Sequence, residues 1–593
     1  MNTTKTNVPP PEKTHSLHRR HWMLGSATAA TALNGWSSST RAQESRLATR
    51  STTVARGKHG VVATVHPLAS QAAMAAYERG GNAIDAAAAA SVMLSVVDGF
   101  NSGIGGGCLA LVRTSSGKVH AIDGREKAPA AATPEMFYRD GKPNPQLSQV
   151  GPLAAGVPGL LSALDRLVRT HGAIDWSDAL AGAASVARDG FILDSNYASR
   201  LRGVAKTLKR FPTSAKILLD SSGQPWVAGH RLVQNDLANT FAQLAEHGID
   251  WFYNGEFAER TERFMKSKAG MLTADDFANY NCVARQPIQS DYRGHKVFGF
   301  PPPSSGGIHI AQMLGMLSAY DVAAIFKEDE ARGRHLLLEV MKRAMADRAY
   351  WLGDSDFAKV PRGLLDSGYL KDRAEDIDLD RAVTVESHGQ PPGADIDLFG
   401  NGGHTTHLTT ADRDGNVVSL TQTVNTTFGC KMIVPGTGVV LNNELDDFSI
   451  APGVRNAFGL IGSEANLIAP GKRPLSSMSP TLVLDGDGRP VMSCGAAGGP
   501  KIITASLQVV LGCIDLGRDI GAAIAAPRCH HQWSPDRAVC EEKINEGVRE
   551  ELSRRGHEIS VIRSSAVSQG LQFEGDEIVS ASDPRVPSSA MAW

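Results

Sequence analysis

The residue with the clearest chemical potential is a threonine that follows a glycine-rich stretch. Gly402-Gly403-His404 precedes Thr405, where a β-rich run begins. The α-amino group of an N-terminal threonine has a pKa of about 7.7–8.0 and can activate its own hydroxyl as a nucleophile. Cleavage between His404 and Thr405 would create that group, and an exposed glycine loop is sterically open to cleavage. Because most threonines at strand starts are structural, the local pattern alone gives only a hypothesis.

Two other motifs suggest chemistry but fit it poorly. A nucleotide-binding loop follows a strand and opens a helix, whereas the glycines of Asn101–Gly107 precede the apolar strand Cys108–Val112. Cys529-His530-His531 with Cys540 offers zinc-ligand types, but the spacing matches no familiar finger and adjacent rings cannot easily aim at one ion. We therefore expect no phosphate site, no metal and no cofactor.

Two hairpins and one helix are expected to position Thr405 and the glycines downstream. The first hairpin joins Thr405–Ala411 to Val417–Val424 through a turn at Asp412–Asn416. The second joins Leu482–Leu484 to Val491–Ser493, and Gly498-Gly499 then leads into a helix from Ile502 to Ile514.

The remaining elements alternate between strand and helix patterns. Upstream, a strand is expected at Gly60–Val65 and helices at Pro67–Arg79 and Ala83–Val97. Helical spacing dominates residues 161–350, and residues 383–403 are expected to form a surface loop. One face of a helix in the middle segment is expected in the core, formed by Leu336, Leu337, Val340, Met341, Ala344 and Met345.

Length and composition limit the class of protein. The 593 residues could form two to four domains or one large layered α/β unit. Sixty Lys and Arg nearly balance 62 Asp and Glu, which gives no basic field for nucleic acid and favours small-molecule partners. The seven cysteines are scattered and odd in number, unlike a disulfide framework.

The N-terminus has the layout of a twin-arginine export signal. Arg19-Arg20 precedes a mildly apolar stretch, and Thr40-Arg41-Ala42 is a small-residue site at which we expect cleavage after Ala42. Elsewhere the longest mainly apolar run, Ala86–Val97, is too short to span a bilayer, which needs about 20 residues. We expect an exported, periplasmic protein without a membrane span.

Several longer motifs resemble the γ-glutamyltransferase family in that family's order, from about residue 57 to the end. Around Thr405 they are Thr405-Thr406-His407, Asp414-Gly415-Asn416, Asn425-Thr426-Thr427-Phe428-Gly429 and Leu441–Phe448. Elsewhere they are Asp123–Glu126, Gly156–Gly159, Pro302–Gly307, Ala346-Asp347-Arg348, Arg473–Pro480 and Ala526-Pro527-Arg528. Each piece alone is weak, whereas their combination is specific.

The resemblance implies an α/β (α+β) fold, a four-layer αββα sandwich of the N-terminal nucleophile hydrolase type. One precursor would be cut after His404 into a large segment, residues 43–404, and a small segment, residues 405–593, which form a heterodimer after loss of residues 1–42. The implied activity is hydrolysis or transfer of γ-glutamyl groups from donors such as glutathione to water, amino acids or peptides.

The resemblance also implies roles for matching residues. Thr405 would attack the γ-carbonyl, Thr423 would hydrogen-bond to its hydroxyl or amine, and backbone N–H groups of Gly498 and Gly499 would face the oxyanion. Arg125 would bind the α-carboxylate, with Ser476 and Ser477 as hydroxyl donors. The α-ammonium would be held by Asp447 together with Glu444 and Asn425. Taken without the resemblance, the residues favour structural roles: a domain-bridging salt bridge for Arg125 and turn capping for the serines.

Two departures from the family pattern concern processing and closure. Phe458, in the expected lid Pro452–Gly462, stands where many bacterial relatives have tyrosine, so a polar latch to Asn425 is lost. Gly403-His404 replaces the polar amides that commonly precede the nucleophile, which leaves the cleavage rate open.

Two alternatives remain open. A glutaryl-cephalosporin acylase resembles the sequence throughout but handles an acyl group without an α-ammonium, and the presence of Asp447 favours the amino-bearing substrate. A precursor that never matures would instead act as a periplasmic binding protein.

Overall fold

The computed structural model describes residues 53–393, 405–451, 453–461 and 463–593. All of these residues belong to one structural unit. The expected export signal, residues 1–42, and the expected cleavage residue His404 lie outside the described residues.

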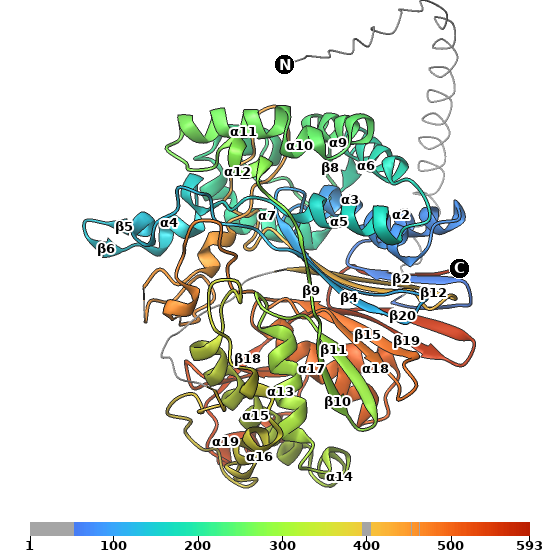
Figure 1. Cartoon of the computed structure of the whole chain (residues 1–593), viewed down its shortest axis with the longest axis vertical. Helices are drawn as coiled ribbons and strands as arrows, with labels where there is room; N and C mark the ends of the chain where they lie inside the picture. The colour runs from blue at the N-terminus through green and yellow to red at the C-terminus, as the bar shows by residue number, and fades with distance from the viewer. Residues whose placement is uncertain (1–52, 394–404, 452, 462) are drawn as a thin grey trace, which may run out of the picture. The chain divides into compact units, whose positions relative to one another are not determined.

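Two seven-stranded antiparallel sheets lie against each other at the centre of this unit (Figure 1). The first sheet has the order β21-β2-β12-β13-β3-β4-β9, with bounds Ser589–Ala592, Gly60–Thr64, Thr406–Asp412, Val417–Thr423, Gly107–Arg113, Val119–Gly124 and Val283–Arg285. The second has the order β1-β20-β19-β15-β14-β11-β10, with bounds Val54–Gly57, Glu577–Ser582, Val567–Glu574, Pro490–Ala497, Thr481–Leu484, His295–Gly299 and Ile288–Tyr292. Each sheet contains strands from both sides of residue 404.

Helices cover the outer face of each sheet, which makes the αββα sandwich that the sequence predicts (Figure 1). On the first sheet lie α2 (Pro67–Glu78), α3 (Ala83–Val97) and α5 (Leu160–His171). On the second lie α13 (Gly306–Leu317), α17 (Lys501–Ile514) and α18 (Ile520–Ala525), with α15 (Glu330–Trp351) packed on α13.

Further helices and small sheets surround these layers. The helices are α4 (Pro145–Gln149), α6 (Ser177–Asp189), α7 (Ser195–Leu208), α8 (Pro212–Leu218), α9 (Asn235–His247), α10 (Asp250–Tyr253), α11 (Glu256–Ser267), α12 (Ala274–Ala278), α14 (Val322–Glu328), α16 (Ser367–Glu375) and α19 (Glu546–Arg554). A three-stranded sheet has the order β16-β17-β18, with bounds Cys529–His531, Ala538–Glu541 and Ile559–Ile562. The two-stranded sheets are β5 (Tyr138–Arg139) with β6 (Lys142–Pro143) and β7 (Phe191–Ile192) with β8 (Arg231–Leu232).

Helices α3 and α15 are buried on more faces than the spacing of their apolar residues predicts. All fifteen residues of α3 are buried, and its alanines let it pack closely between the first sheet, α2 and α6. Asn82 caps α3 through a capping box with Asp85. The six predicted apolar positions of α15 are in the core, but its other faces are buried too, including Arg343 and Arg348.

The strands that the sequence patterns do not predict include β1, β9, β10 and β11, which lie at or near sheet edges, and also β4, β19 and β20, which lie inside their sheets. Strand β1 precedes the first expected strand, while β9, β10 and β11 fall in the segment expected to be helical. Strands β1, β9 and β10 are edge strands, and their residues alternate between partly buried and exposed positions. Such short strands lack the apolar alternation by which central strands are recognised.

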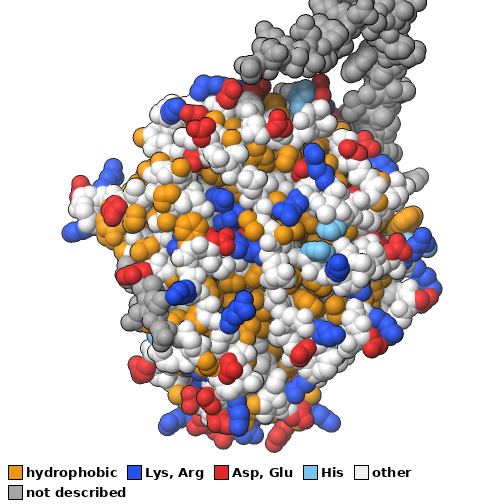
Figure 2. All heavy atoms as spheres, viewed as in Figure 1, with side chains coloured by type: hydrophobic (Ala, Val, Ile, Leu, Met, Phe, Trp, Pro, Cys, Tyr) orange, Lys and Arg blue, Asp and Glu red, His pale blue; other side chains and the backbone are white. Residues whose placement is uncertain are grey.

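Three further features of the described residues concern surface charge, membrane spans and disulfides. On the face shown in Figure 2, Lys and Arg side chains are interspersed with Asp and Glu. Among the described helices none alone is long and apolar enough to cross a membrane; α13 and α14 pass that test only together, bent by 71°. All seven cysteines lie within the described residues and form no disulfide there.

The glycine cluster before β3 has a packing explanation. A Cβ atom on Gly106 would lie 1.8 Å from the carbonyl oxygen of Thr423, the last residue of β13. Only glycine allows the turn before β3 to approach the end of its neighbouring strand so closely. The cluster therefore fixes the ends of β3 and β13.

Replacing Gly106 by alanine should strongly destabilise the protein, because the new methyl group would overlap the backbone of Thr423. We expect loss of folded, soluble protein or a large fall in Tm in thermal unfolding. Gly203→Ala is the matched control, since Gly203 lies within α7 and an added Cβ atom would have no neighbour within 4 Å. Alanine there should stabilise by about 0.5–1 kcal/mol. Equal Tm values for the two variants would contradict this explanation.

Candidate active site

Thr405 directly precedes β12, whose even-numbered side chains face the helices on the first sheet. Thr406 Oγ1 donates a hydrogen bond to Asp98 Oδ2 at 2.5 Å, and Thr410 Oγ1 donates to the carbonyl of Ala83 at 2.7 Å. Burial raises the pKa of Asp98 to about 7, although the hydrogen bond from Thr406 opposes this shift. The first contact anchors the start of β12 against Asp98, the residue that follows the C-terminal end of α3, and the second anchors Thr410 against the N-terminal end of α3.

The odd-numbered side chains of β12 face the second sheet. Thr409 Oγ1 lies 2.9 Å from Ser493 Oγ on β15. Two residues earlier, the buried ring of His407 lies over Gly495, where an added Cβ atom would come within 2.3 Å of the ring. Because side chains of a strand alternate between faces, Thr405 points the same way, toward the end of β15.

A cavity of about 270 Å³ lies where Thr405 meets the second sheet, and its lining includes Thr405, Ala497 and Gly498. Gly498 and Gly499 have φ values of 144° and 64°, in the region that favours glycine, and α17 begins two residues later at Lys501. The structure thus brings the candidate nucleophile and the first candidate oxyanion glycine to one cavity.

Adjacent strands of the first sheet connect Thr405 with Arg125. Since Thr406 pairs with Gln422, Thr405 lies opposite Thr423 when the register is extended by one residue. Thr423 pairs with Gly107 on β3, and β3 pairs with β4, after which Arg125 follows. Thr423 Oγ1 accepts a hydrogen bond from the backbone N–H of Asn425 at 2.7 Å.

Arg125 is fully buried at the centre of a cluster of carboxylates. Its guanidinium donates to Glu444 and, at 2.5 Å, to Asp447, and it lies 3.5 Å from Glu126. Its Nε donates to the carbonyl of Pro474 at 3.1 Å. Arg125 therefore does make the structural salt bridges that the sequence left as an alternative, and it makes them with two residues expected to bind substrate.

Three carboxylate oxygens of this cluster lack a partner. Asp447 Oδ1, Glu444 Oε2 and Glu126 Oε1 are buried without a hydrogen bond from any described residue. Burial raises the pKa of Asp447 and of Glu444 well above the ordinary range, although Arg125 opposes the shift, and raises that of Glu126 to about 7. Such a cluster can accept hydrogen bonds from a cationic ligand, which would stabilise the ionised carboxylates.

The remaining predicted polar residues border this cluster and already have partners. Asn425 Nδ2 donates to the carbonyl of Asn443 at 2.8 Å. Ser476 Oγ accepts from the backbone N–H of Met478 at 3.1 Å, which is the turn-capping alternative. Ser477 Oγ accepts from Arg348 Nη2 at 3.0 Å.

Arg348 is a site residue that the sequence reasoning does not select. This buried guanidinium also donates to Ser305 Oγ at 2.8 Å, but forms no ion pair among the described residues. Burial lowers its pKa to about 10, and the charge of Asp447 opposes that shift. The Ala346-Asp347-Arg348 motif on α15 is the signal that could have found it.

The expected lid is described from 453 to 461, whereas Pro452 and Gly462 lie outside the described residues. The backbone N–H of Ala457 donates to Asp446 Oδ2 at 3.1 Å, beside Asp447. Arg455 donates to Ser534 Oγ at 3.1 Å, and the partly buried Phe458 packs against the core of the second sheet. The loop is thus attached next to the charge cluster, and its role as a lid stays a prediction.

The Cys529-His530-His531 motif does not converge on one point. His530 Nδ1 lies 2.8 Å from Thr504 Oγ1, whereas His531 Nε2 lies 3.1 Å from Asp536. Cys529 is paired in register with Cys540 across the antiparallel strands β16 and β17.

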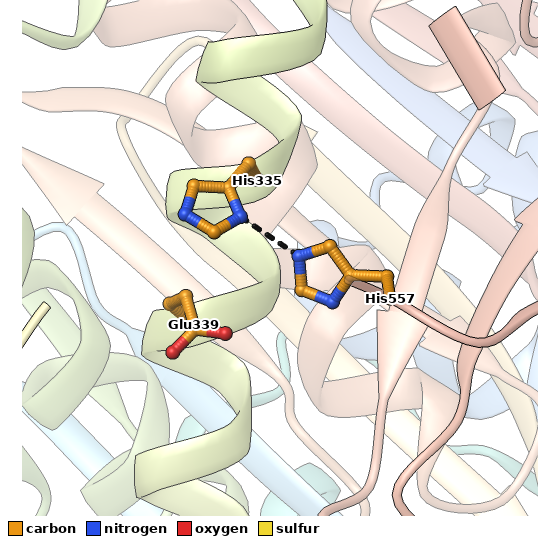
Figure 3. Close-up of side chains that lie close together, drawn as sticks. All are labelled: His335, Glu339 and His557. Atoms are coloured by element: carbon orange, nitrogen blue, oxygen red, sulfur yellow. Dashed lines mark hydrogen bonds between the residues drawn. The ribbon is translucent and has the colours of Figure 1, made fainter. Parts of the chain in front are cut away.

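A different group, His335, Glu339 and His557, has metal-ligand types close together (Figure 3). His335 Nδ1 and His557 Nε2 are 2.8 Å apart in a hydrogen bond, and His335 Nε2 contacts the carbonyl of Asp378 at 2.7 Å. Both oxygens of Glu339 are engaged, by Lys342 at 2.8 Å and by Arg343 at 2.7 Å. A metal ion would have to displace the proton between the rings and compete with two cations, so the arrangement fits a satisfied hydrogen-bond network.

Comparison with known proteins shows the family of this chain. The family described as Gamma-glutamyltranspeptidase matches residues 69–593. A glutathione hydrolase proenzyme of Escherichia coli (strain K12) is 39% identical over 533 residues, covering 89% of this chain and 91% of the relative. An acylase ACY 1 proenzyme of Pseudomonas sp. (strain SE83) is 36% identical over 529 residues, covering 87% and 90%.

Among solved structures, cephalosporin acylase from Bacillus halodurans superposes with a TM-score of 0.81 at 27% identity, covering 92% of this chain and 97% of that one. The family match and the sequence identity agree on the family of this chain. The chain belongs to the γ-glutamyltranspeptidase family of the N-terminal nucleophile hydrolases.

Proposed function

We propose that this protein is a self-processing γ-glutamyltransferase and glutathione hydrolase. Residues 1–42 direct export to the periplasm by the twin-arginine route, and cleavage between His404 and Thr405 yields segments 43–404 and 405–593, which remain together as a heterodimer. The mature enzyme transfers the γ-glutamyl group of glutathione-like donors to water, an amino acid or a peptide.

The observation that carries this proposal is the buried ion pair of Arg125 and Asp447 with its unpartnered carboxylate oxygens. An α-amino acid group is a zwitterion, so it can enter the cluster without changing its net charge. Its carboxylate matches the guanidinium of Arg125, and its ammonium supplies donors to Asp447 and Glu444. A glutaryl group would add only negative charge to a site that already holds three carboxylates.

The chemistry begins at the processed N-terminus. The free amine of Thr405 takes the proton of its own hydroxyl, and Oγ1 forms a bond to the γ-carbonyl carbon of the substrate. The C–N bond of the amide then breaks, and the leaving amine receives the proton. Water or an acceptor amine attacks the resulting ester by the same steps in reverse. Thr423, opposite Thr405, is the hydrogen-bond partner proposed to orient this group.

The backbone at Gly498 and Gly499 is proposed to stabilise the oxyanion. Gly498 lines the cavity with Thr405, and both glycines precede α17. N–H groups fixed near the start of a helix are oriented toward developing negative charge before reaction begins.

Thr405→Ala should prevent both processing and catalysis, because it removes the hydroxyl used in each. Wild-type protein should give two bands in denaturing electrophoresis, the smaller beginning at Thr405, whereas the variant should give one. Its γ-glutamyl anilide hydrolysis should fall by at least about a thousandfold. Thr410→Ala, the same change on the helix-facing side of β12, should still be processed. A persistent single band for wild-type protein would instead support the non-processing binding protein.

Wild-type enzyme should prefer a γ-glutamyl anilide to a glutaryl anilide, because only the first offers an ammonium to Asp447. Asp447→Asn should lower the ratio of the two kcat/KM values by about tenfold or more, as expected for loss of a hydrogen bond to a charged group. Asp446→Asn is the control, since Asp446 contacts Ser148 at 2.6 Å and Ala457 rather than Arg125. A wild-type preference for the glutaryl substrate would favour the acylase alternative.

Gly498→Ala should lower kcat by about 10²–10³-fold with a smaller effect on KM, because the oxyanion forms only during reaction. The added Cβ would lie 3.2 Å from Ala566 at a φ of 144°, so the backbone must shift. Gly488→Ala controls for strain alone, since Gly488 has a φ of 84° in the β14–β15 turn and open space around it. Equal kinetic effects of the two variants would argue against an oxyanion role.

A further inference from the structure

Lys501 is a cation in the same cavity as Thr405 and has no ion-pair partner among the described residues. It is the first residue of α17, and it lines the cavity together with Gly498. No described carboxylate lies within ion-pair distance, 4.0 Å, of its ammonium group. Burial is the cause that lowers its pKa.

The position of Lys501 is not explained by the stability of α17. A cation in the first turn of a helix lies at the positive end of the helix dipole, where acidic residues are favoured. A partly buried ammonium without a counterion also has a desolvation cost. Two unfavourable effects at one residue beside the candidate nucleophile point to a ligand that supplies negative charge.

The lining of the cavity includes no residue of the Arg125 cluster. Its lining contains none of the proposed γ-glutamyl-binding residues Arg125, Asn425, Glu444, Asp447, Ser476 and Ser477. It contains instead Asp98, Asp194 and Arg200, besides Lys501. The acidic members are already engaged, because Asp98 accepts from Thr406 and Asp194 caps α7 by accepting from Tyr197 at 2.7 Å.

Resting on the proposed function, we propose that Lys501 binds the carboxylate of the amino acid or peptide on the amine side of the scissile bond. In the first half-reaction this group belongs to the leaving amine of a γ-glutamyl peptide. In the second it belongs to the acceptor, whose amine attacks the acyl-enzyme while its carboxylate is held by Lys501. The residue is thus a specificity determinant for carboxylate-bearing leaving groups and acceptors.

The test compares matched acceptors with the processed enzyme. With a γ-glutamyl anilide as donor, transfer to glycylglycine is compared with transfer to glycylglycinamide, which lacks the carboxylate. Lys501→Met should lower the ratio of the two kcat/KM values by about tenfold to a hundredfold, the range expected for a hydrogen bond to a charged group. Lys501→Arg should restore most of the ratio, and Arg200→Gln, which changes the other cation of the cavity, should retain it.

Three outcomes would overturn the assignment. An unchanged ratio in Lys501→Met, or equal losses with both acceptors, would show that the lysine does not read the carboxylate. A ratio lost in Arg200→Gln but kept in Lys501→Met would assign the role to Arg200. Absence of any γ-glutamyl anilide turnover by processed wild-type enzyme would overturn the proposed function itself, which separates that failure from the failure of Lys501.

Discussion

The contact between β12 and β15 is the constraint on which the candidate site depends. Two sheets usually pack about 10 Å apart, with the space filled by side chains from both faces. Here the imidazole of His407 fills that space over Gly495, and Thr409 meets Ser493 by a hydrogen bond. Because the two contacts are two residues apart on each strand, the next pair in the same direction places Thr405 at the end of β15, beside the loop at Gly498. The nucleophile and the proposed oxyanion site are therefore aligned by sheet packing.

The charge cluster adds an energetic constraint. Breaking a buried ion pair by removing one partner typically costs about 3–5 kcal/mol, because the remaining charge stays uncompensated. Arg125 holds Glu444 and Asp447 in this way, so the free site is already organised around opposite charges. The unpartnered oxygens show that this organisation is incomplete without a further donor. A substrate ammonium would supply that donor. The free energy of binding would then come from recognition of the positive charge of the substrate.

The sequence predicts the strands around Thr405 better than the other strands. Strands β2, β12, β13, β14 and β15 and helices α3 and α17 follow from strong alternation, turn residues and small-residue packing, whereas the edge strands β1, β9 and β10 leave no such pattern. The family resemblance supplies the site residues, and the structure groups Arg125, Glu444 and Asp447 directly. The resemblance could not supply the ionic state of that group, since burial and hydrogen-bond partners depend on tertiary structure. Arg348 and Lys501 are missed for the same reason. Arg348 stands out only because it is buried without an ion-pair partner among the described residues. Lys501 stands out only because it lines a cavity with Thr405 and likewise has no ion-pair partner among those residues.

The strand order also explains how a cut before Thr405 could leave the fold intact. Strand β12 lies between β2 and β13, and β13 lies between β12 and β3. The two strands that follow the proposed cut are thus hydrogen-bonded on their outer sides to strands that precede it. Separating the segments would break both of these ladders and expose the faces of β12 and β13, which are buried at every position. A new N-terminus at Thr405 would therefore stay fixed in the centre of the sheet, with Thr406 held by Asp98 on one face and Thr405 directed toward Gly498 on the other.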